Sequence, residues 1–375
     1  MFTPETSGRF EKYVHPETGV VSYLLKNETA PFQKLFHPAS HSATLDGRYC
    51  WILCAHPPGG WMEGSALTAA CIDFETDEIY RHPDIRGDGA CAAPLTGELY
   101  FQTDNLILRK GPRPDAQVDI IAKVPAEWRV FPGRMATHLT FSADRTKLCC
   151  DIASGNDIYI AGLDIASGEF ELWRKLHGGW SHAQFSPADN DLILLAMDRW
   201  QDIKTGLHHD IPYDDKGKRA RCWTIRRGEN PVLHPPLHSE CSHEWWSAGG
   251  KHIYYCDEQN GIGKINLQTG EHSMFYTSLS SHGHSCADGS FLCTGKIYPG
   301  GAARASFHSI RSAKSVVMLE SPAAYHQGES SAYDIGPHPR FVFGDRYIAQ
   351  STTLNGPGKL TVAFTNVDQL RRMTI

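Results

Sequence analysis

Two stretches near the middle of the chain share one pattern: His138-Leu-Thr-Phe-Ser-Ala-Asp144-Arg-Thr-Lys-Leu148 and His182-Ala-Gln-Phe-Ser-Pro-Ala-Asp189-Asn-Asp-Leu-Ile-Leu194. Each begins with a histidine, continues into a short apolar run, turns at an aspartate and resumes as a second apolar run. Short apolar runs separated by Asp/Gly turns are typical of β-hairpins. The same pattern recurs along the whole chain, so it decides the fold.

Seven copies of the pattern align on their turns. They lie near residues 41–54, 90–103, 138–152, 182–196, 243–257, 282–295 and 338–352. Several are followed by a second hairpin with its own turn, as in Asp164-Ile-Ala-Ser-Gly168, so each repeat supplies four strands. Seven four-stranded units, spaced roughly 40–60 residues apart, are typical of a β-propeller. We predict an all-β, seven-bladed propeller forming a single domain over residues 1–375, closed by a strand from residues 11–25. Only the tail at 367–373 has a helical pattern.

The composition excludes several classes of protein. The chain has 375 residues, with 36 Lys+Arg against 42 Asp+Glu, and this mild acidity argues against nucleic-acid binding. No apolar run approaches the ~20 residues that span a bilayer, and the N-terminus lacks a secretory signal. The eleven cysteines contain no CxxC pair and indicate reduced, buried thiols. We expect a cytoplasmic protein that binds neither nucleic acid nor membrane, of open oligomeric state.

Histidine is unusually frequent, with 20 copies, and its placement is regular. In five successive repeats a histidine stands six or seven residues before the turn: His138, His182, His243, His282 and His338. Equivalent positions in a propeller are related by rotation about the axis, so these side chains should lie at one height. Blade 1 has Ser40 or His41 near this place, and blade 2 has Ala90. The histidines therefore form one axial pocket or, alternatively, each locks its own blade.

The residues flanking these histidines carry further motifs. They are His182-Ala-Gln-Phe-Ser-Pro187, Arg221-Cys-Trp223, Cys241-Ser-His243-Glu-Trp-Trp-Ser247, Ser281-His282-Gly-His-Ser-Cys-Ala-Asp-Gly-Ser290 and Gly336-Pro-His338-Pro-Arg-Phe341. In order and spacing they resemble the oligogalacturonate lyases, polysaccharide lyase family 22. The likeness covers most of the chain and is strongest from 135 to 368. It implies a seven-bladed propeller that degrades short pectin fragments in the cytoplasm by metal-assisted β-elimination, typically with Mn²⁺.

The resemblance also implies roles for four residues. His243 falls where the family has its Brønsted base, and Arg221 falls where the family has an arginine beside the substrate. His282 and His338 fall on two of the family's metal-binding histidines.

The metal ligand pattern departs from that of the family at two places. The family has a Gln and a further His where this chain has Tyr333 and Gly336. Two histidines alone make a weak site, because catalytic metal centres commonly have three protein ligands and an open position. Either other residues complete the set, with His284, His326 and Gln327 the nearest, or the metal is absent from this protein.

β-Elimination on a uronate needs a base for the C5 proton and a cation at the carboxylate where charge develops. A neutral histidine can take the proton, and a divalent metal or a bidentate arginine can meet the charge. The departing O4 needs an acid or water, for which His182, Tyr333 and His284 are candidates. His138 and Gln327 are further auxiliary or substrate-binding candidates. So is His209, which lies in a polar stretch, residues 201–218, that could cover the pocket.

Our leading hypothesis is a carbohydrate lyase that cleaves a uronate-containing oligosaccharide by β-elimination with a divalent metal, Mn²⁺ being the first choice. One alternative is a metal-dependent epimerase, lactonase or isomerase in the same axial pocket, which would form no unsaturated product. The other is a non-enzymatic propeller that binds a sugar or a protein. That alternative predicts no convergence of the histidines with Arg221.

Overall fold

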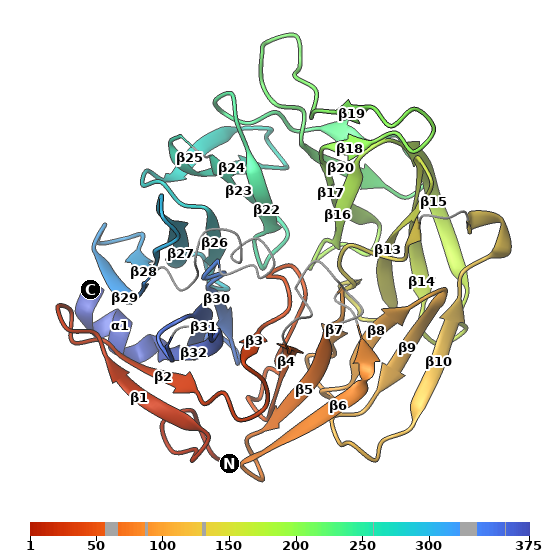
Figure 1. The fold of residues 1–375 in the computed structure, drawn as a ribbon. Coiled ribbons are helices and arrows are strands. Elements are labelled where there is room, and N and C mark those ends of the chain that lie inside the picture. The colour runs from red at the N-terminus through yellow and green to blue at the C-terminus, as the bar shows by residue number, and fades with distance from the viewer. Residues whose placement is uncertain (57–66, 87–88, 130–132, 258, 323–335, 357) are drawn as a thin grey trace.

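A computed structural model of the chain describes residues 1–375 except 57–66, 87–88, 130–132, 258, 323–335 and 357. Seven β-sheets surround a central axis, which confirms the predicted all-β, seven-bladed propeller (Figure 1). The described helices are a 3₁₀ turn, η2 (Ala126–Trp128), and the predicted C-terminal helix, α1 (Val367–Thr374). Neither is long and apolar enough to cross a membrane.

Each blade is an antiparallel sheet whose first strand lies nearest the axis (Figure 1). Blades 1 and 2 are β3 (Phe32–Lys34), β4 (Tyr49–Ala55), β5 (Thr68–Asp73), β6 (Glu78–Arg86), and β7 (Cys91–Ala92), β8 (Leu99–Thr103), β9 (Leu106–Lys110), β10 (Val118–Lys123). Blade 3 is β11 (Gly133–Arg134), β12 (Thr140–Phe141), β13 (Lys147–Ser154), β14 (Asp157–Asp164) and β15 (Phe170–His177). Blade 4 is β16 (Trp180–Phe185), β17 (Leu192–Met197), β20 (Cys222–Arg226) and β21 (Val232–Leu233).

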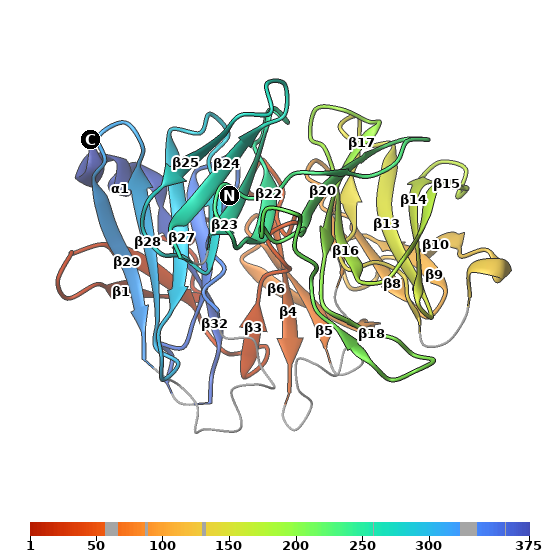
Figure 2. The same cartoon turned by 90° about the horizontal axis from the view of Figure 1, so that it is seen from above.

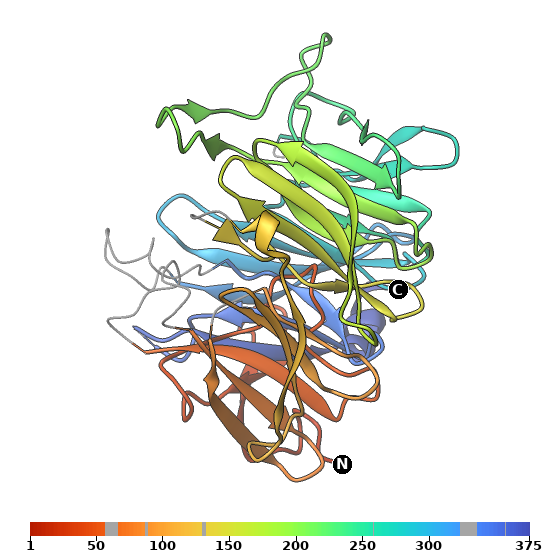
Figure 3. The same ribbon diagram turned by 90° about the vertical axis from the view of Figure 1, so that its right-hand side faces the viewer.

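The remaining blades complete the circle. Blade 5 is β22 (Ser242–Trp246), β23 (His252–Asp257), β24 (Gly261–Asn266) and β25 (His272–Tyr276). Blade 6 is β26 (His282–Ser285), β27 (Phe291–Ile297), β28 (Ala303–Ser309) and β29 (Ser315–Ser321). Blade 7 contains β30 (Arg340–Val342), β31 (Tyr347–Thr352) and β32 (Thr361–Asn366). A separate hairpin, β18 (Trp200–Gln201) with β19 (His208–His209), leaves blade 4 and extends from one face of the ring (Figures 2 and 3).

The N-terminal segment closes the ring, as predicted. Strand β2 (Val21–Leu25) pairs with β32, and β1 (Phe10–Val14) adds a fifth strand outside it. The hydroxyls of Ser22 and Thr365 lie 2.7 Å apart across this junction. The two ends of the chain therefore share one sheet, and the segment supplies two strands where we expected one.

Four of the innermost strands are irregular at the point nearest the axis. In blade 3, β11 and β12 both pair with β13, and His138 lies in the break between them. In blade 1, the break lies between β3 and the bridge that joins Ala43 to Cys50. The strand registers of β16 and β22 shift at bulges that contain His182 and His243. Bulges of this kind re-aim side chains and occur beside functional sites.

Apolar side chains from neighbouring blades fill the space between the sheets. Trp51 is fully buried between blades 1 and 2, and its Nε1 donates to the carbonyl of Gly97 at 2.8 Å. All eleven cysteines are buried and free, in agreement with the expectation of packed thiols.

Substitution of Leu25 tests how strongly the closing strand holds the ring. Leu25 is fully buried against the core of blades 1 and 7, so Leu25→Ala should lower the free energy of unfolding by about 2–5 kcal/mol. Val14 belongs to the same hairpin but is 49% exposed, so Val14→Ala should change the free energy of unfolding by less than about 0.5 kcal/mol. Urea denaturation measures both. Equal effects of the two variants would show that the hairpin does not close the ring.

Candidate active site

Among the residues that the structure describes, six histidines converge on the axis, one from every blade except blade 2. They are His37, His138, His182, His243, His282 and His338. Ring centroids are 3.9 Å apart for His37 and His138, and 4.8 Å apart for His138 and His182. On the other side of the axis they are 4.2 Å apart for His243 and His282. The rings of His282 and His338 are 3.8 Å apart, and 6.4 Å separates His338 from His37. We call these six side chains the histidine ring.

The structure corrects the prediction for blade 1. Its member of the histidine ring is His37, and neither Ser40 nor His41 takes this place. The loop between β3 and the Ala43 bridge is longer than the equivalent segments in the other blades. A count of six or seven residues back from the turn therefore reaches Ser40 or His41 and stops short of His37. The other five histidines converge as the repeat register indicated.

Three members of the histidine ring have a left-handed backbone. The φ angles are 54° at His182, 47° at His243 and 38° at His338. Left-handed conformations are uncommon for residues with a Cβ and cluster at functional sites. Here they turn side chains from three equivalent strand positions toward one another.

Burial keeps the imidazoles of His37, His138, His243 and His282 neutral. It lowers the pKa of His243 to about 4 in spite of the nearby carboxylate of Glu244, and the charge of Arg221 lowers it further. Burial likewise holds the pKa values of His37, His138 and His282 well below the ordinary value. A neutral imidazole has a free lone pair, so each ring can act as a base or a metal ligand near neutral pH.

Arg221 lies beside the histidine ring, at the start of β20, and is held by two carboxylates. Its Nε donates to Glu244 at 2.9 Å, its Nη2 donates to Glu244 at 3.4 Å, and its Nη1 donates to Asp198. The side chains of Arg221 and Glu244 are 8% and 2% exposed. Of the five N–H groups of the guanidinium, these contacts use three and leave two for a ligand.

Asp198 connects Arg221 to the histidine ring. Its Oδ2 lies 3.4 Å from Nε2 of His182, and Ser181 also donates to it. Burial alone would raise the pKa of Asp198, but the hydrogen bond with His182 and the charge of Arg221 lower it. Asp198 is therefore an anion that orients both His182 and Arg221.

A cavity of about 720 Å³ opens beside this network. Its wall includes Asp198, the side chains of Trp180 and Trp200, and four arginines: Arg134, Arg199, Arg219 and Arg221. Trp200 belongs to the β18–β19 hairpin and stacks on His209, with ring centroids 4.4 Å apart. This places the predicted polar stretch at the cavity, with His209 exposed behind Trp200. Tryptophans and arginines are side chains that can stack on sugar rings and bind carboxylates.

The other sequence candidates are not part of the histidine ring. His284 lies two residues beyond His282 on β26 and lines a different cavity of about 440 Å³ together with His41 and Arg340. Burial, with the charge of Arg340, lowers the pKa of His284 to about 3. Tyr333, Gln327 and His326 lie outside the described residues.

Sequence reasoning missed three residues of the site. Asp198 follows the apolar strand β17, and Glu244 directly follows His243. An isolated carboxylate at the end of an apolar run would have been a usable signal, because a buried carboxylate needs a partner. His37 gave no such signal, since its position depends on the length of one loop.

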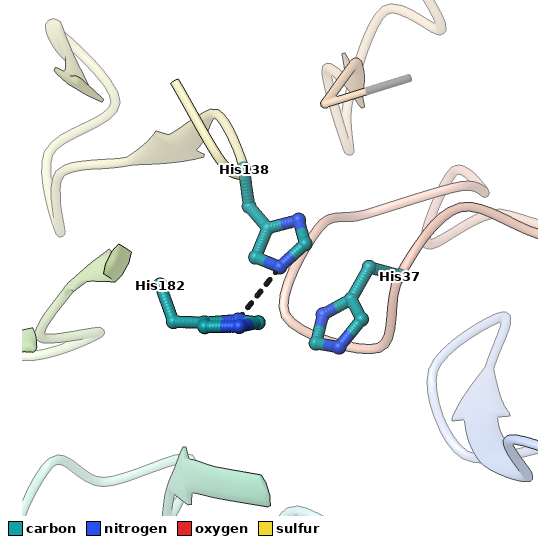
Figure 4. Close-up of side chains that lie close together, drawn as sticks. All are labelled: His37, His138 and His182. Carbon is teal, nitrogen blue, oxygen red and sulfur yellow. Dashed lines mark hydrogen bonds between the residues drawn. The ribbon is translucent and has the colours of Figure 1, made fainter. Parts of the chain in front are cut away.

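The residues present fit a divalent metal ion. Among the described residues, one group of three potential ligands has nitrogen atoms that all lie within 4.8 Å of one another, namely His37, His138 and His182 (Figure 4). The pair that the resemblance indicated, His282 and His338, supplies two nitrogens, and Gly336 has no side chain to add.

The fold and site together define a seven-bladed propeller with an axial cluster of histidines. No protein-family model matches the sequence, and no curated protein matches it. Among solved structures, the chain is similar to one described as "Oligogalacturonate lyase in complex with manganese", with a TM-score of 0.75 and 16% identity over 95% of this chain and 96% of that one. A second is an oligogalacturonate lyase from Vibrio parahaemolyticus, with a TM-score of 0.72 and 16% identity over 96% of each chain.

A third similar structure, hydrazine synthase from Kuenenia stuttgartiensis, has a TM-score of 0.52 and 12% identity over 88% of this chain and 96% of that one. At these identities the comparisons establish the fold. The function has to be argued from the side chains.

Removal of Arg221 should destabilise the protein, because Glu244 would remain buried without a partner. We expect Arg221→Met to lower the free energy of unfolding by about 3–5 kcal/mol, and a second change, Glu244→Gln, to restore part of it. Arg199 is 74% exposed and pairs with exposed Asp210, so Arg199→Met should change stability by less than about 0.5 kcal/mol. Urea denaturation measures all three. An unaffected Arg221→Met variant would contradict the paired arrangement.

Buried neutral histidines should also make stability fall in acid. Burial lowers the pKa of His308 to about 4, outside the histidine ring, while the hydroxyls of Thr294 and Ser315 contact its ring nitrogens. Between pH 6.5 and 4 the imidazole of His308 is protonated in the unfolded chain but not in the native protein. The free energy of unfolding therefore decreases as the pH falls. At pH 5 this costs about 2 kcal/mol. His308→Asn should reduce the stability difference between pH 7 and pH 5 by about that amount. Identical pH dependence in both proteins would refute the assignment.

Proposed function

We propose that this protein is a lyase that cleaves a uronate-containing oligosaccharide by β-elimination. One observation carries the proposal: Arg221 lines a cavity together with three further arginines, and it lies close enough to neutral His243 for its charge to lower the pKa of that imidazole. This arrangement puts a base and a carboxylate-binding group together, which is what removal of a proton next to a carboxylate requires. The shared fold with two oligogalacturonate lyases supports the same reading.

In this proposal His243 accepts the C5 proton of the uronate. Its depressed pKa keeps the imidazole unprotonated at neutral pH. The two remaining N–H groups of Arg221 bind the uronate carboxylate, and the carboxylates of Asp198 and Glu244 hold the guanidinium in place. Because charge develops on the substrate carboxylate during proton removal, this contact strengthens in the transition state and lowers the barrier.

The departing O4 receives a proton from a second group. We assign this role to a solvent water, because Nε2 of His182 faces Asp198 and its Nδ1 faces His138, which leaves His182 no proton directed at the cavity. Tyr333 remains an untested alternative for this role. Trp200 would stack on a sugar ring flanking the cleaved bond, while Trp180 is buried against Trp223 and supports the cavity wall.

A divalent metal, when bound, supplies a Lewis acid that neutralises charge on the uronate carboxylate. Mn²⁺ is the first candidate, because the similar lyase structure is a manganese complex. The histidine ring provides its ligands. The eleven free, buried cysteines accord with a reducing compartment, and we place the protein in the cytoplasm on that basis.

Ultraviolet absorbance tests the reaction directly. Incubation with pectic, glucuronate-containing and alginate-type fragments should yield a rising signal from the unsaturated uronate, with one of these classes preferred. His243→Ala should reduce the rate by at least about 100-fold, the contribution typical of a general base. His252→Ala, on β23 and outside both the histidine ring and the cavity wall, is the matched control and should retain most of the rate.

A flat trace for every fragment would refute the lyase. If uronate substrates were nevertheless converted to a saturated isomer, the epimerase or isomerase alternative would replace it. If no substrate were changed, the binding propeller would remain.

A further inference from the structure

We propose that the metal site of this protein is formed by His37, His138 and His182, on the opposite side of the axis from the ligand positions that the family resemblance indicates. The inference concerns the metal invoked in the proposed function. It can be tested without any substrate, so it can fail or hold separately from the lyase activity.

The three imidazoles come from three different blades and point toward one another (Figure 4). Nε2 of His138 donates a hydrogen bond to Nδ1 of His182 at 2.9 Å (Figure 4), so a metal ion that bound both atoms would take the place of this proton. The ring of His37 stacks on that of His138 at an interplanar angle of 8°. Because stacked rings hold their nitrogen lone pairs in parallel planes, His37 has to rotate about its side-chain bonds before its nitrogen, already within 4.8 Å of the other two, can bind the same ion. Three histidine ligands with an open fourth position are a common catalytic metal site.

Asp198 supplies the outer contact that metal-binding histidines usually have. With the Nε2–H of His182 directed at Asp198, the lone pair on Nδ1 faces His138 and the site. Carboxylates placed behind a ligating imidazole fix its tautomer and increase its basicity. The same carboxylate holds Arg221, so metal and substrate-binding arginine share one anchor.

Arg340 fixes the third ligand. Its Nη1 donates to the carbonyl of His37 at 3.1 Å and to that of Ser40 at 2.7 Å, and its Nη2 donates to the hydroxyl of Ser42. Arg340 is 4% exposed, and the loop that it ties down is the one that carries His37. We assign Arg340 as a positioning residue that holds His37 in the histidine ring.

The alternative pair is weaker as a metal site. Nδ1 of His282 is buried with no hydrogen-bond partner among the described residues, and His338 lies beside it. In the described part of the chain these two imidazoles have no third ligand close to both. The group of His37, His138 and His182 needs no residue beyond those described.

The donor atoms also indicate which ions should bind. Imidazole nitrogens suit zinc, cobalt, iron and nickel, whereas magnesium and calcium require oxygen ligands. We therefore expect Co²⁺ and Zn²⁺ to bind more tightly than Mn²⁺, and Mg²⁺ to bind least.

The site can be tested by titrating chelator-treated full-length protein with Co²⁺ and following the visible absorption of the bound ion. Competition with Zn²⁺, Mn²⁺ and Mg²⁺ then tests the expected order of affinities. The wild type should bind one ion per chain. His138→Ala and His37→Ala should abolish the absorption, and Asp198→Asn should weaken binding about 10–100-fold. Arg340→Met should weaken it less. His282→Ala and His338→Ala are the matched controls and should bind within about threefold of the wild type, since an unchanged ligand set preserves affinity.

Circular dichroism of each metal-free variant identifies any that fail to fold. His37 lies in a loop, where a substitution disturbs the sheets less. His37→Ala therefore still tests the ligand set if His138→Ala does not fold. Loss of binding in His282→Ala or His338→Ala, with retention in His37→Ala, would move the metal to the pair indicated by the resemblance. The absence of any Co²⁺ binding by the wild type would overturn the inference.

Discussion

Closure of the ring by the pairing of β2 with β32 is the constraint on which the site depends. A propeller blade has only its neighbours to pack against, so an open ring would expose the apolar faces of two blades. Closure fixes all the inner strands around one axis. Residues that are equivalent in the repeats, yet more than 200 positions apart in the chain, thereby become neighbours. His37 and His338 lie on either side of this closure, and their rings are 6.4 Å apart.

The inner strands give up regular structure to form the histidine ring. His182, His243 and His338 each have a left-handed backbone, at a typical cost of about 1–2 kcal/mol per residue. Breaks and bulges at four strands leave ladder hydrogen bonds unmade. A fold stabilised by the packing of seven blades can tolerate these costs, and the gain is a set of side chains aimed at one point. Irregular backbone at the histidines of several inner strands is expected of a binding or catalytic site, and blade-locking histidines would not require it.

Two carboxylates organise the charged part of the site, beside the histidine ring. Asp198 and Glu244 hold Arg221 by three hydrogen bonds, and Asp198 also faces His182. The four arginines of the cavity wall each pair with a carboxylate of the protein. A uronate carboxylate that enters the cavity would therefore share a guanidinium group with a carboxylate already in place, and the buried, neutral imidazole of His243 lies close to that group at Arg221.

The sequence was sufficient to predict the fold and most of the histidine ring, because both follow from a repeat whose turns and apolar runs can be counted. The seven blades, the N-terminal closure and five of six ring histidines were predicted from this register. His37 could not be predicted in this way, because its position depends on a loop that is longer than the equivalent loops of the other blades. Asp198 and Glu244 were missed because their importance comes from contact with Arg221, which only the folded chain brings about. His284 was a reasonable candidate by spacing, but a shift of two residues along β26 moves it to another cavity.

A crystal structure of the His243→Ala protein with a uronate trisaccharide would test the central claim, that the cavity beside the histidine ring is the uronate site. The account predicts the sugar between Trp200 and the histidine ring, with one carboxylate on Arg221 and C5 facing the space left by His243. A sugar bound elsewhere on the propeller, with Arg221 still enclosed by Asp198 and Glu244, would contradict it.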